Sequence, residues 1–232
     1  MATGLLYDIH GNLPALEAVL RDARDTPVTR WVLGGDYGSF GAWPAEVVSR
    51  LDELQDAVWI RGNWDRWQRG ERDDMPPGED LQAALATVVD ALGPDLIARL
   101  ANLPETHREG DVLFCHGAPR TDMDSFLPDP TDHDDQLLAG VDARVVVFGH
   151  THLMVDRQHG GIHLLNPGSV GLPFDGDPKA HWGVLHDGGR AELRRVGYDV
   201  DEAINGLTTR FAGATWLDGT TARLRKATFN GE

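Results

Sequence analysis

Two histidines, His150 and His152, follow a hydrophobic run and a glycine in the stretch VFGHTHLM. Imidazoles at the end of a buried strand can belong to a polar turn, or they can bind a metal ion. Asp8 and His10 show the same one-residue gap after the short apolar run GLLY near the start of the chain. Two pairs of donor side chains at predicted strand ends are therefore the first candidates for chemistry.

Further donors follow other hydrophobic runs, and each lies near a glycine that lets the backbone turn sharply beside a ligand. The full set of candidate metal ligands is Asp8, His10, Asp36, Asn63, His116, His150 and His152. Mixed nitrogen and oxygen donors suit borderline divalent ions such as Mn²⁺, Fe²⁺ or Zn²⁺. Structural zinc usually takes cysteine thiolates, and this chain has one cysteine, so the pattern favours an open catalytic site.

Repeated strand–turn–helix patterns explain how these donors could meet. Strands are predicted at 4–7, 30–34 and 57–60, with helices at 13–24 and 44–54. Such units predict an α/β sheet whose strand ends gather on one edge, where ligands bind. Later strands are expected before His116, before His150 and before Asn166.

The rest of the chain predicts one domain over residues 1–232 with a helical insertion at about 70–105. The insertion should contain two helices, DLQAALATVVDAL and DLIARLANL, separated by Gly93 and Pro94. A hairpin is expected around 183–199 with its turn at 187–189, followed by a last helix in DVDEAINGLTTRFAG. No repeat, long linker or low-complexity tract divides the sequence.

Composition restricts the class of protein. The 232 residues are 41% hydrophobic, which is enough for a sizeable core without disulfides, and Cys115 has no cysteine partner. The net charge of −16 argues against stable nucleic-acid binding. We expect neither a signal peptide nor a membrane span, and so a cytoplasmic protein.

Taken together, the motifs D-x-H (8–10), G-D (35–36), G-N-x-D (62–65), H-G (116–117) and G-H-T-H (149–152) resemble the calcineurin-like metallophosphoesterase superfamily. NPGSVG at 166–171 resembles a segment of its small bacterial members, related to diadenosine tetraphosphatases and small phosphodiesterases. The resemblance implies a four-layer α/β/β/α sandwich with two mixed sheets and two metal ions at one edge. Manganese is favoured, with Fe, Zn, Ni or Co as alternatives.

The resemblance also implies roles for these residues. Asp8, His10 and His152 would bind one ion, Asn63, His116 and His150 would bind the other, and Asp36 would bridge them. A hydroxide bridging ions about 3.5–4 Å apart would attack a phosphate monoester or diester, a small molecule or a nucleotide. Asp36, Asn63 and Asp65 are the predicted catalytic residues.

The sequence departs from the family at Trp64, where the usual G-N-H-D has become G-N-W-D. An indole N–H cannot release its proton near pH 7, so Trp64 cannot replace a general-acid histidine. His181 or a water molecule is the alternative acid. Slow turnover or a preference for good leaving groups is expected.

Several other residues each have two interpretations. Trp64, Arg61 and His181 are candidate substrate contacts; Arg61 and Arg120 could instead be solvated. Trp43, Trp64, Trp67 and Phe40 could stack on an aryl group or nucleobase, although packing or a homodimer contact is favoured. Two other functions stay open: a non-catalytic interaction scaffold, and a serine/threonine protein phosphatase.

Overall fold

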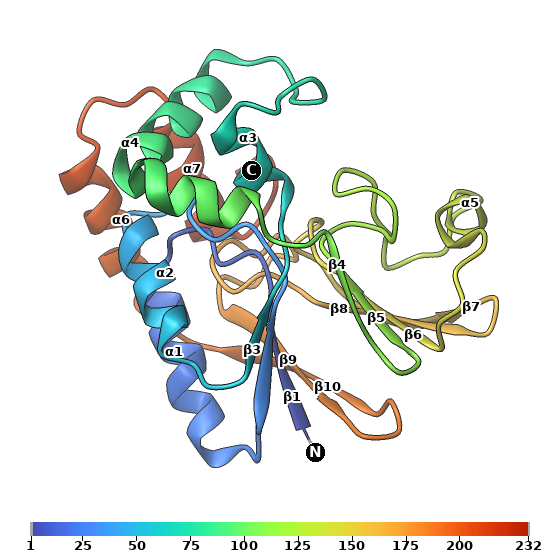
Figure 1. Ribbon diagram of the computed structural model, residues 1–232. Helices are drawn as coiled ribbons and strands as arrows, with labels where there is room; N and C mark the ends of the chain where they lie inside the picture. Colours follow the sequence, from blue (N-terminus) through green and yellow to red (C-terminus); the bar gives the residue numbers. More distant parts are fainter. Residues whose placement is uncertain (1, 232) are drawn as a thin grey trace.

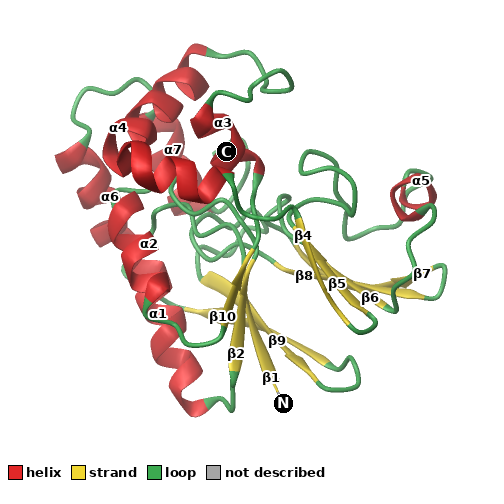
Figure 2. Ribbon diagram, in the orientation of Figure 1, coloured by secondary structure: helices red, strands yellow, loops and turns green. Residues whose placement is uncertain are grey.

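A computed structural model describes residues 2–231, which form two β-sheets with helices outside them (Figures 1 and 2). The first sheet has the order β10-β9-β1-β2-β3. Its strands are β1 Ala2–Leu6, β2 Arg30–Leu33, β3 Ala57–Trp59, β9 Ala180–His186 and β10 Ala191–Val196. The strands β1, β2 and β3 are parallel, whereas β9 runs antiparallel to both β1 and β10. The polar ends of β1, β2 and β3 therefore meet at one edge.

The second sheet has the order β4-β5-β6-β8-β7. Its strands are β4 Thr106–Glu109, β5 Val112–Cys115, β6 Val145–Val147, β7 Met154–His159 and β8 Ile162–Pro167. The central strands β5, β6 and β8 are parallel, and the outer strands β4 and β7 are antiparallel to their neighbours. This sheet also gathers polar strand ends on one edge.

Most helices lie on the outer side of the first sheet, and α5 lies beyond the second sheet at the opposite side of the molecule (Figure 1). The helices are α1 Leu13–Asp22, α2 Pro44–Asp52, α3 Asn63–Arg69, α4 Glu79–Ala101, α5 Asp134–Leu138, α6 Val200–Arg210 and α7 Leu217–Lys226; a 3₁₀ turn, η1, covers Ala23–Asp25. The prediction of two mixed sheets in layers with helices outside is confirmed.

Three apolar clusters hold the layers together. Leu5, Val32, Val147 and Leu165 pack between the two sheets. A larger cluster joins the first sheet to the helices, and a third lies between the second sheet and α5. The burial of both faces explains why β1 and β6 read as short continuous hydrophobic runs.

Helix α1 shows how the sequence sets the position of an element. The Asn12 side chain accepts a hydrogen bond from the Ala15 N–H at 3.2 Å and caps the helix, and proline is tolerated in the first turn. Ala15, Leu16 and Val19 then fall on the buried face at helical spacing. The cap fixes where α1 starts, just beyond His10.

Helix α4 is broken at Gly93, whose φ of 73° and ψ of 167° are not helical. The two predicted helices on either side of Gly93 and Pro94 are therefore observed. By length and composition, α4 is the one helix in the described residues that could cross a membrane. The break leaves two segments shorter than the roughly 20 residues of a spanning helix, and Leu85, Val88 and Leu100 pack in the main core.

The predicted hairpin of β9 and β10 is confirmed, whereas five helices and strands were not predicted: α3, β4, α5, β7 and α7. Edge strands β4 and β7 are polar because only one side of each is paired within its sheet. Helix α7 contains a glycine and two threonines, which are weak helix formers, so its helical pattern is faint.

The packing of α1 gives a test of the fold. Leu16 is 0% exposed, whereas Leu127 is 45% exposed. We expect Leu16→Ala to lower the free energy of unfolding by about 2–5 kcal/mol, because it leaves a cavity under the sheet. The matched Leu127→Ala change should stay within about 0.5 kcal/mol of the parent protein in urea unfolding. Equal losses in the two variants would contradict this description of the core.

Candidate metal centre

The seven candidate ligands come together where the strand ends of the two sheets face each other. Asp8, His10, Asp36 and Asn63 follow strands of the first sheet, and His116, His150 and His152 follow strands of the second. Six of the seven are at most 5% exposed, and His150 is half-buried. Such burial of polar side chains is unfavourable unless each finds a partner.

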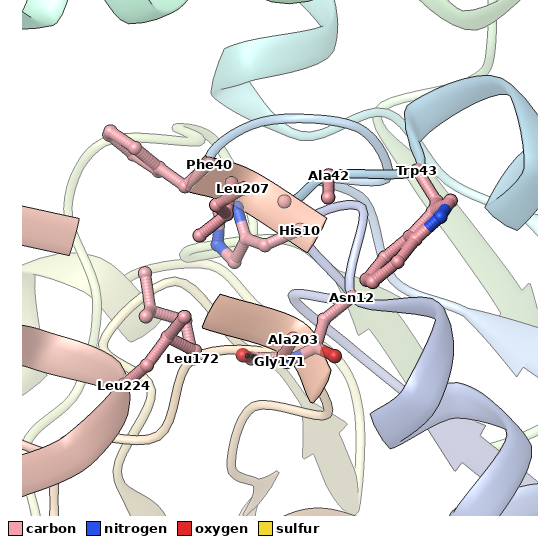
Figure 3. A pocket seen from close by; sticks show the side chains of 11 residues that line it. His10, Asn12, Phe40, Ala42, Trp43, Gly171, Leu172, Ala203, Leu207 and Leu224 are labelled. Carbon is pink, nitrogen blue, oxygen red and sulfur yellow. Dashed lines mark hydrogen bonds between the residues drawn. The ribbon is translucent and has the colours of Figure 1, made fainter. Parts of the chain in front are cut away.

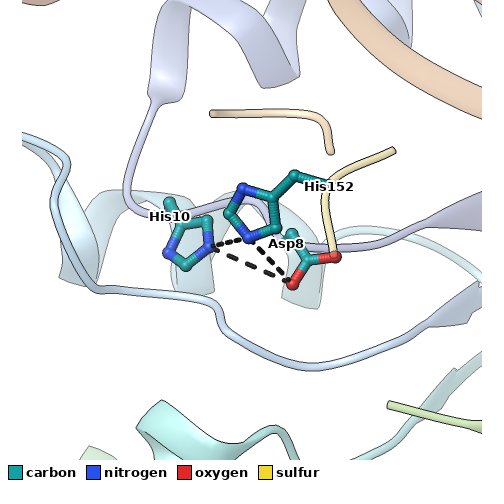
Figure 4. Close-up of side chains that lie close together, drawn as sticks. All are labelled: Asp8, His10 and His152. Carbon is teal, nitrogen blue, oxygen red and sulfur yellow. Dashed lines mark hydrogen bonds and ion pairs between the residues drawn. The ribbon is translucent and has the colours of Figure 1, made fainter. Parts of the chain in front are cut away.

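One group is formed by Asp8, His10 and His152, which point toward one another in Figure 4. The Nε2 atoms of His10 and His152 lie 3.0 Å apart. Asp8 Oδ1 lies 3.5 Å from His152 Nε2 and 4.0 Å from His10 Nε2. This oxygen is buried and accepts no hydrogen bond from the described residues. A carboxylate oxygen in that situation fits a cation as its missing partner.

A second group surrounds the Asn63 side-chain oxygen. His116 Nε2 lies 3.0 Å from Asn63 Oδ1, and His150 Nδ1 lies 3.1 Å from the same atom. Asp36 connects the two groups, because its Oδ2 lies 3.6 Å from His116 Nε2 and 4.0 Å from His10 Nε2. Asp8 Oδ1 also lies 3.9 Å from His116 Nε2, so both carboxylates face both groups.

The remaining ring nitrogens fix which atoms point inward. His116 Nδ1 donates to the Gly34 carbonyl at 2.8 Å, and His152 Nδ1 donates to the Leu172 carbonyl at 2.5 Å. His10 Nδ1 lies 2.7 Å from the Ser39 hydroxyl. Partners of this kind hold the rings with the Nε2 lone pair toward the centre, as metal-binding histidines require.

The electrostatics of the cluster keep two of its rings, His10 and His150, neutral. The pKa of His116 is instead raised, because the neighbouring carboxylates outweigh burial. Burial holds the pKa of His10 well below its usual range, and His152 beside it adds to the effect. Burial, with a contribution from His116, lowers the pKa of His150 to about 4. Burial also raises the pKa of Asp8, but His152, His116 and His10 outweigh it and lower the pKa overall. Neutral rings beside an ionised carboxylate fit a divalent cation.

The backbone bends unusually at most of these residues. Asp8, His10, Asp36, His150 and His152 all have φ between 52° and 67°. This left-handed region is disfavoured for residues other than glycine, and Asp and Asn tolerate it best. Each D-x-H or H-x-H pair thus turns both of its side chains toward the centre.

Two glycines allow the loops to approach this closely. A Cβ on Gly62 would lie 2.2 Å from Asp36 Oδ1, and one on Gly149 would lie 2.6 Å from Asp8 Oδ2. The predicted role of glycine, close approach beside a ligand, is therefore observed at both positions.

Asp65, a predicted catalytic residue, does not point into the centre. Its carboxylate accepts backbone N–H bonds from Gly62 at 2.8 Å, Asp36 at 2.9 Å and Tyr37 at 3.3 Å. Burial raises its pKa to about 6, although these amides oppose the rise. Asp65 ties the loop after β2 to the start of α3 and so positions Asp36 and Asn63.

Trp64 lies in the main core and is 5% exposed. Its ring packs edge-on against Phe40 at 4.6 Å and against Trp67 at 5.4 Å between centroids. Its backbone N–H donates to Asp36 Oδ1 at 3.0 Å, which leaves Oδ2 of Asp36 for the centre. The indole therefore acts as a packing element in this structure.

The other predicted contacts lie farther out or are buried. His181 is 0% exposed under Gly168, neither ring nitrogen has a hydrogen-bond partner among the described residues, and burial lowers its pKa to about 4. Arg61 donates to the Ala101 carbonyl and to Glu105. Arg120 donates to the Gln136 carbonyl.

Two hollows adjoin the centre. A cavity of about 10 Å³ behind His10 lies between the loop after β1 and helices α6 and α7 (Figure 3). It holds about one water molecule and cannot take a substrate. A hollow of about 350 Å³ reaches His116 and is also lined by Arg61 and Arg120. Both predicted arginines therefore face a space large enough for a small ligand.

Comparisons with known proteins point the same way. The calcineurin-like phosphoesterase superfamily domain matches residues 1–187. The chain is 32% identical over 187 residues to the phosphodiesterase YfcE of Escherichia coli K12, covering 77% of this chain and 83% of that one. It is 27% identical over 221 residues to the uncharacterized protein MJ0912 of Methanocaldococcus jannaschii, covering 86% and 88%. The crystal structure of a metallophosphoesterase from Sphaerobacter thermophilus superimposes with a TM-score of 0.82 at 26% identity, covering 98% of this chain and 100% of that chain.

The three bonds to Asp65 give a test of its positioning role. In Asp65→Asn, an amide group must face backbone N–H groups that now bond a carboxylate oxygen. We expect the free energy of unfolding at pH 8 to fall by about 2–4 kcal/mol, because buried donors lose their acceptor. Metal affinity should fall as well, by roughly 10–100-fold. The exposed Asp90→Asn change is the control in the same urea and metal titrations, and an unchanged Asp65→Asn protein would contradict the role.

Proposed function

The chain belongs to the calcineurin-like phosphoesterase superfamily, and on that premise we propose that it hydrolyses phosphate mono- or diesters with two divalent metal ions. The observation that carries the proposal is the convergence of six buried donors and the half-buried His150 at one place, where Asp8 Oδ1 is a buried carboxylate oxygen without a hydrogen-bond partner among the described residues. Asp8, His10 and His152 would hold one ion, and Asn63, His116 and His150 would hold the other. Asp36 would lie between them.

When bound, the two ions supply about four positive charges against the two carboxylates, neutralise phosphoryl oxygens and make a water acidic near neutral pH. The chain's own part is to hold the donors rigidly. Asp8 Oδ2 accepts the His150 N–H at 3.0 Å, and Asp36 Oδ1 accepts the Trp64 N–H at 3.0 Å. Each carboxylate thus keeps its other oxygen directed at the centre. This preorganisation is what stabilises charge developing on a phosphoryl group.

Among residues 2–231, no side chain at the centre is placed to protonate the leaving group. Trp64 cannot act as an acid, and Asp65 is engaged by three backbone amides. Arg61 and Arg120 line the hollow beside His116 and could bind substrate oxygens, but guanidinium groups do not release protons. The proposed enzyme therefore depends on esters whose leaving groups depart without protonation.

The proposal is tested by metal-dependent turnover. Metal-stripped protein with Mn²⁺ restored should hydrolyse 4-nitrophenyl phosphate or bis(4-nitrophenyl) phosphate, and the ratio of the two rates reports the preferred ester. The Asp36→Asn, His116→Ala double variant should lose at least about 10³-fold in rate, because both ions lose ligands. Absence of turnover with Mn, Fe, Zn, Ni or Co, despite stoichiometric binding of metal, would favour a non-catalytic scaffold instead.

The missing acid predicts a dependence on the leaving group. Phenyl phosphate should be cleaved far more slowly than 4-nitrophenyl phosphate, because phenolate is the more basic leaving group. Trp64→His should speed phenyl phosphate cleavage by about 10²-fold or more, since a positioned imidazole typically contributes this much. Trp64→Phe is the control, because it also loses the indole and gains no acid. If the His and Phe variants show the same ratio of rates, the position does not lack an acid.

A further inference from the structure

The segment beyond the matched family domain reaches the rim of the metal centre. Helix α6, helix α7 and the residues after them follow residue 187, where the family match ends. The Gly176 N–H donates to the Ala227 carbonyl at 2.8 Å, so the C-terminal segment is joined to the loop after β8. That same loop provides the Leu172 carbonyl that orients His152.

A continuous series of side-chain contacts connects the C-terminal segment to two of the candidate ligands. His10 and His152 lie 4.7 Å apart by ring centroids, and Phe174 stacks on His152 at 4.4 Å. Phe229 meets Phe174 edge-on at 5.5 Å.

Arg223 completes the series, because its guanidinium carbon lies 5.4 Å from the Phe229 ring and 5.8 Å from the Phe40 ring. Phe40 in turn lies 6.0 Å from His10. Arg223 and Phe229 therefore stand one side chain away from the centre.

Arg223 has guanidinium N–H groups that are not bound by a carboxylate. Its Nε donates to the Phe229 carbonyl at 2.8 Å, and no carboxylate in residues 2–231 forms an ion pair with it. By contrast, Arg66 forms ion pairs with Asp74 and Asp122, and Arg210 forms one with Glu46. Burial lowers the pKa of Arg223, which Asp80 only partly offsets. A partly buried guanidinium without a carboxylate is suited to an anionic ligand.

Phe229 is the most exposed aromatic side chain of this contact series. It is 65% exposed, one of two large hydrophobic side chains in the described residues that are exposed to this degree. Phe174 meets it at an interplanar angle of 87°, and the Arg223 guanidinium lies over the ring, yet most of its surface stays exposed. An exposed aromatic ring beside a guanidinium can stack a planar ring and bind its attached phosphate.

We propose that Arg223 and Phe229 form a subsite for the second substituent of the phosphate ester, and that this substituent is a nucleoside. The inference rests on the proposed phosphoesterase function. Arg223 would bind a non-bridging phosphate oxygen, while Phe229 would stack the base. The net charge of −16 favours a small nucleotide ester over a nucleic-acid strand, since a polyanion would be repelled beyond the subsite.

Equilibrium binding tests the subsite independently of turnover. Protein loaded with Mn²⁺ is titrated calorimetrically with adenosine 5′-monophosphate and, separately, with inorganic phosphate. Arg223→Gln should weaken nucleotide binding by about 10-fold or more, which is the usual effect of losing a charged hydrogen bond. Phe229→Ala should weaken it by roughly 5–100-fold, from lost stacking. Phosphate affinity should stay within twofold in Phe229→Ala, because this ring contacts only the base. Arg223→Gln should weaken phosphate as well, because it removes a bond to a phosphate oxygen.

Two further variants separate a specific contact from a general effect. Arg225→Gln changes an exposed arginine on the same helix and should bind the nucleotide like the parent. Arg223→Lys should recover only part of the affinity, because lysine lacks the planar fork. Nucleotide affinity within twofold of the parent in both Arg223→Gln and Phe229→Ala would overturn the proposal. Equal losses for nucleotide and phosphate in Phe229→Ala would do so too, since they would place the effect of that ring at the metal centre.

Kinetics distinguish failure of the subsite from failure of the function. Hydrolysis of 4-nitrophenyl phosphate by the parent protein reports the proposed function alone. For the 4-nitrophenyl ester of thymidine 5′-monophosphate, Phe229→Ala should raise KM by about 10-fold, whereas KM for 4-nitrophenyl phosphate, which has no second substituent, should not change. Arg223→Gln should raise KM for both esters, because both carry the phosphate oxygens. Turnover with an unchanged KM in both variants would contradict the subsite and would still support the proposed phosphoesterase activity.

Discussion

Three buried carboxylates hold together the loops on which the whole centre depends. Asp8 accepts the backbone N–H of His150, Asp36 accepts that of Trp64, and Asp65 accepts three amides from two loops. All of these bonds except the one from Gly62 to Asp65 cross from one strand end to another. A buried carboxylate satisfied by amide donors is a strong and directional connection. The geometry of the donors follows from these connections, because each loop is held by the side chain of its neighbour.

The left-handed backbone at five of the ligands is the second part of this arrangement. Residues with positive φ are unfavourable by themselves, by of order 1–3 kcal/mol each, and persist where the surroundings determine them. Here the surroundings are the carboxylate bonds and the glycines at 62 and 149, whose lack of a side chain lets the loops meet. The backbone at the centre is therefore conformationally strained, and the packing of the two sheets offsets the free-energy cost of that strain.

Much of this could be predicted from the sequence, because strand ends in parallel sheets gather donors at one edge. The strands before the donors, the β9–β10 hairpin and the break at Gly93 followed from hydrophobic runs and glycines. The division of the strands into two mixed sheets followed only from the family resemblance. The role of Asp65 could not be separated from catalysis, since its bonds go to backbone groups that leave no trace in residue types. Helix α7, Arg223 and Phe229 were missed because a polar, threonine-containing helix carries a weak periodic signal.

The ligands are divided between the two sheets, with Asp8 and His150 separated by 142 positions in the chain. Contacts between residues so far apart in the chain form late in folding, because the entropy cost of closing the long loop between them must be overcome first. A chain with only one sheet formed would carry half of the donors, spread along open strand ends and facing water. The complete donor set exists only in the fully assembled sandwich. Any ion bound there would contact donors from both sheets. It would therefore stabilise the assembled sandwich against separation of the two sheets, since it binds only the assembled state.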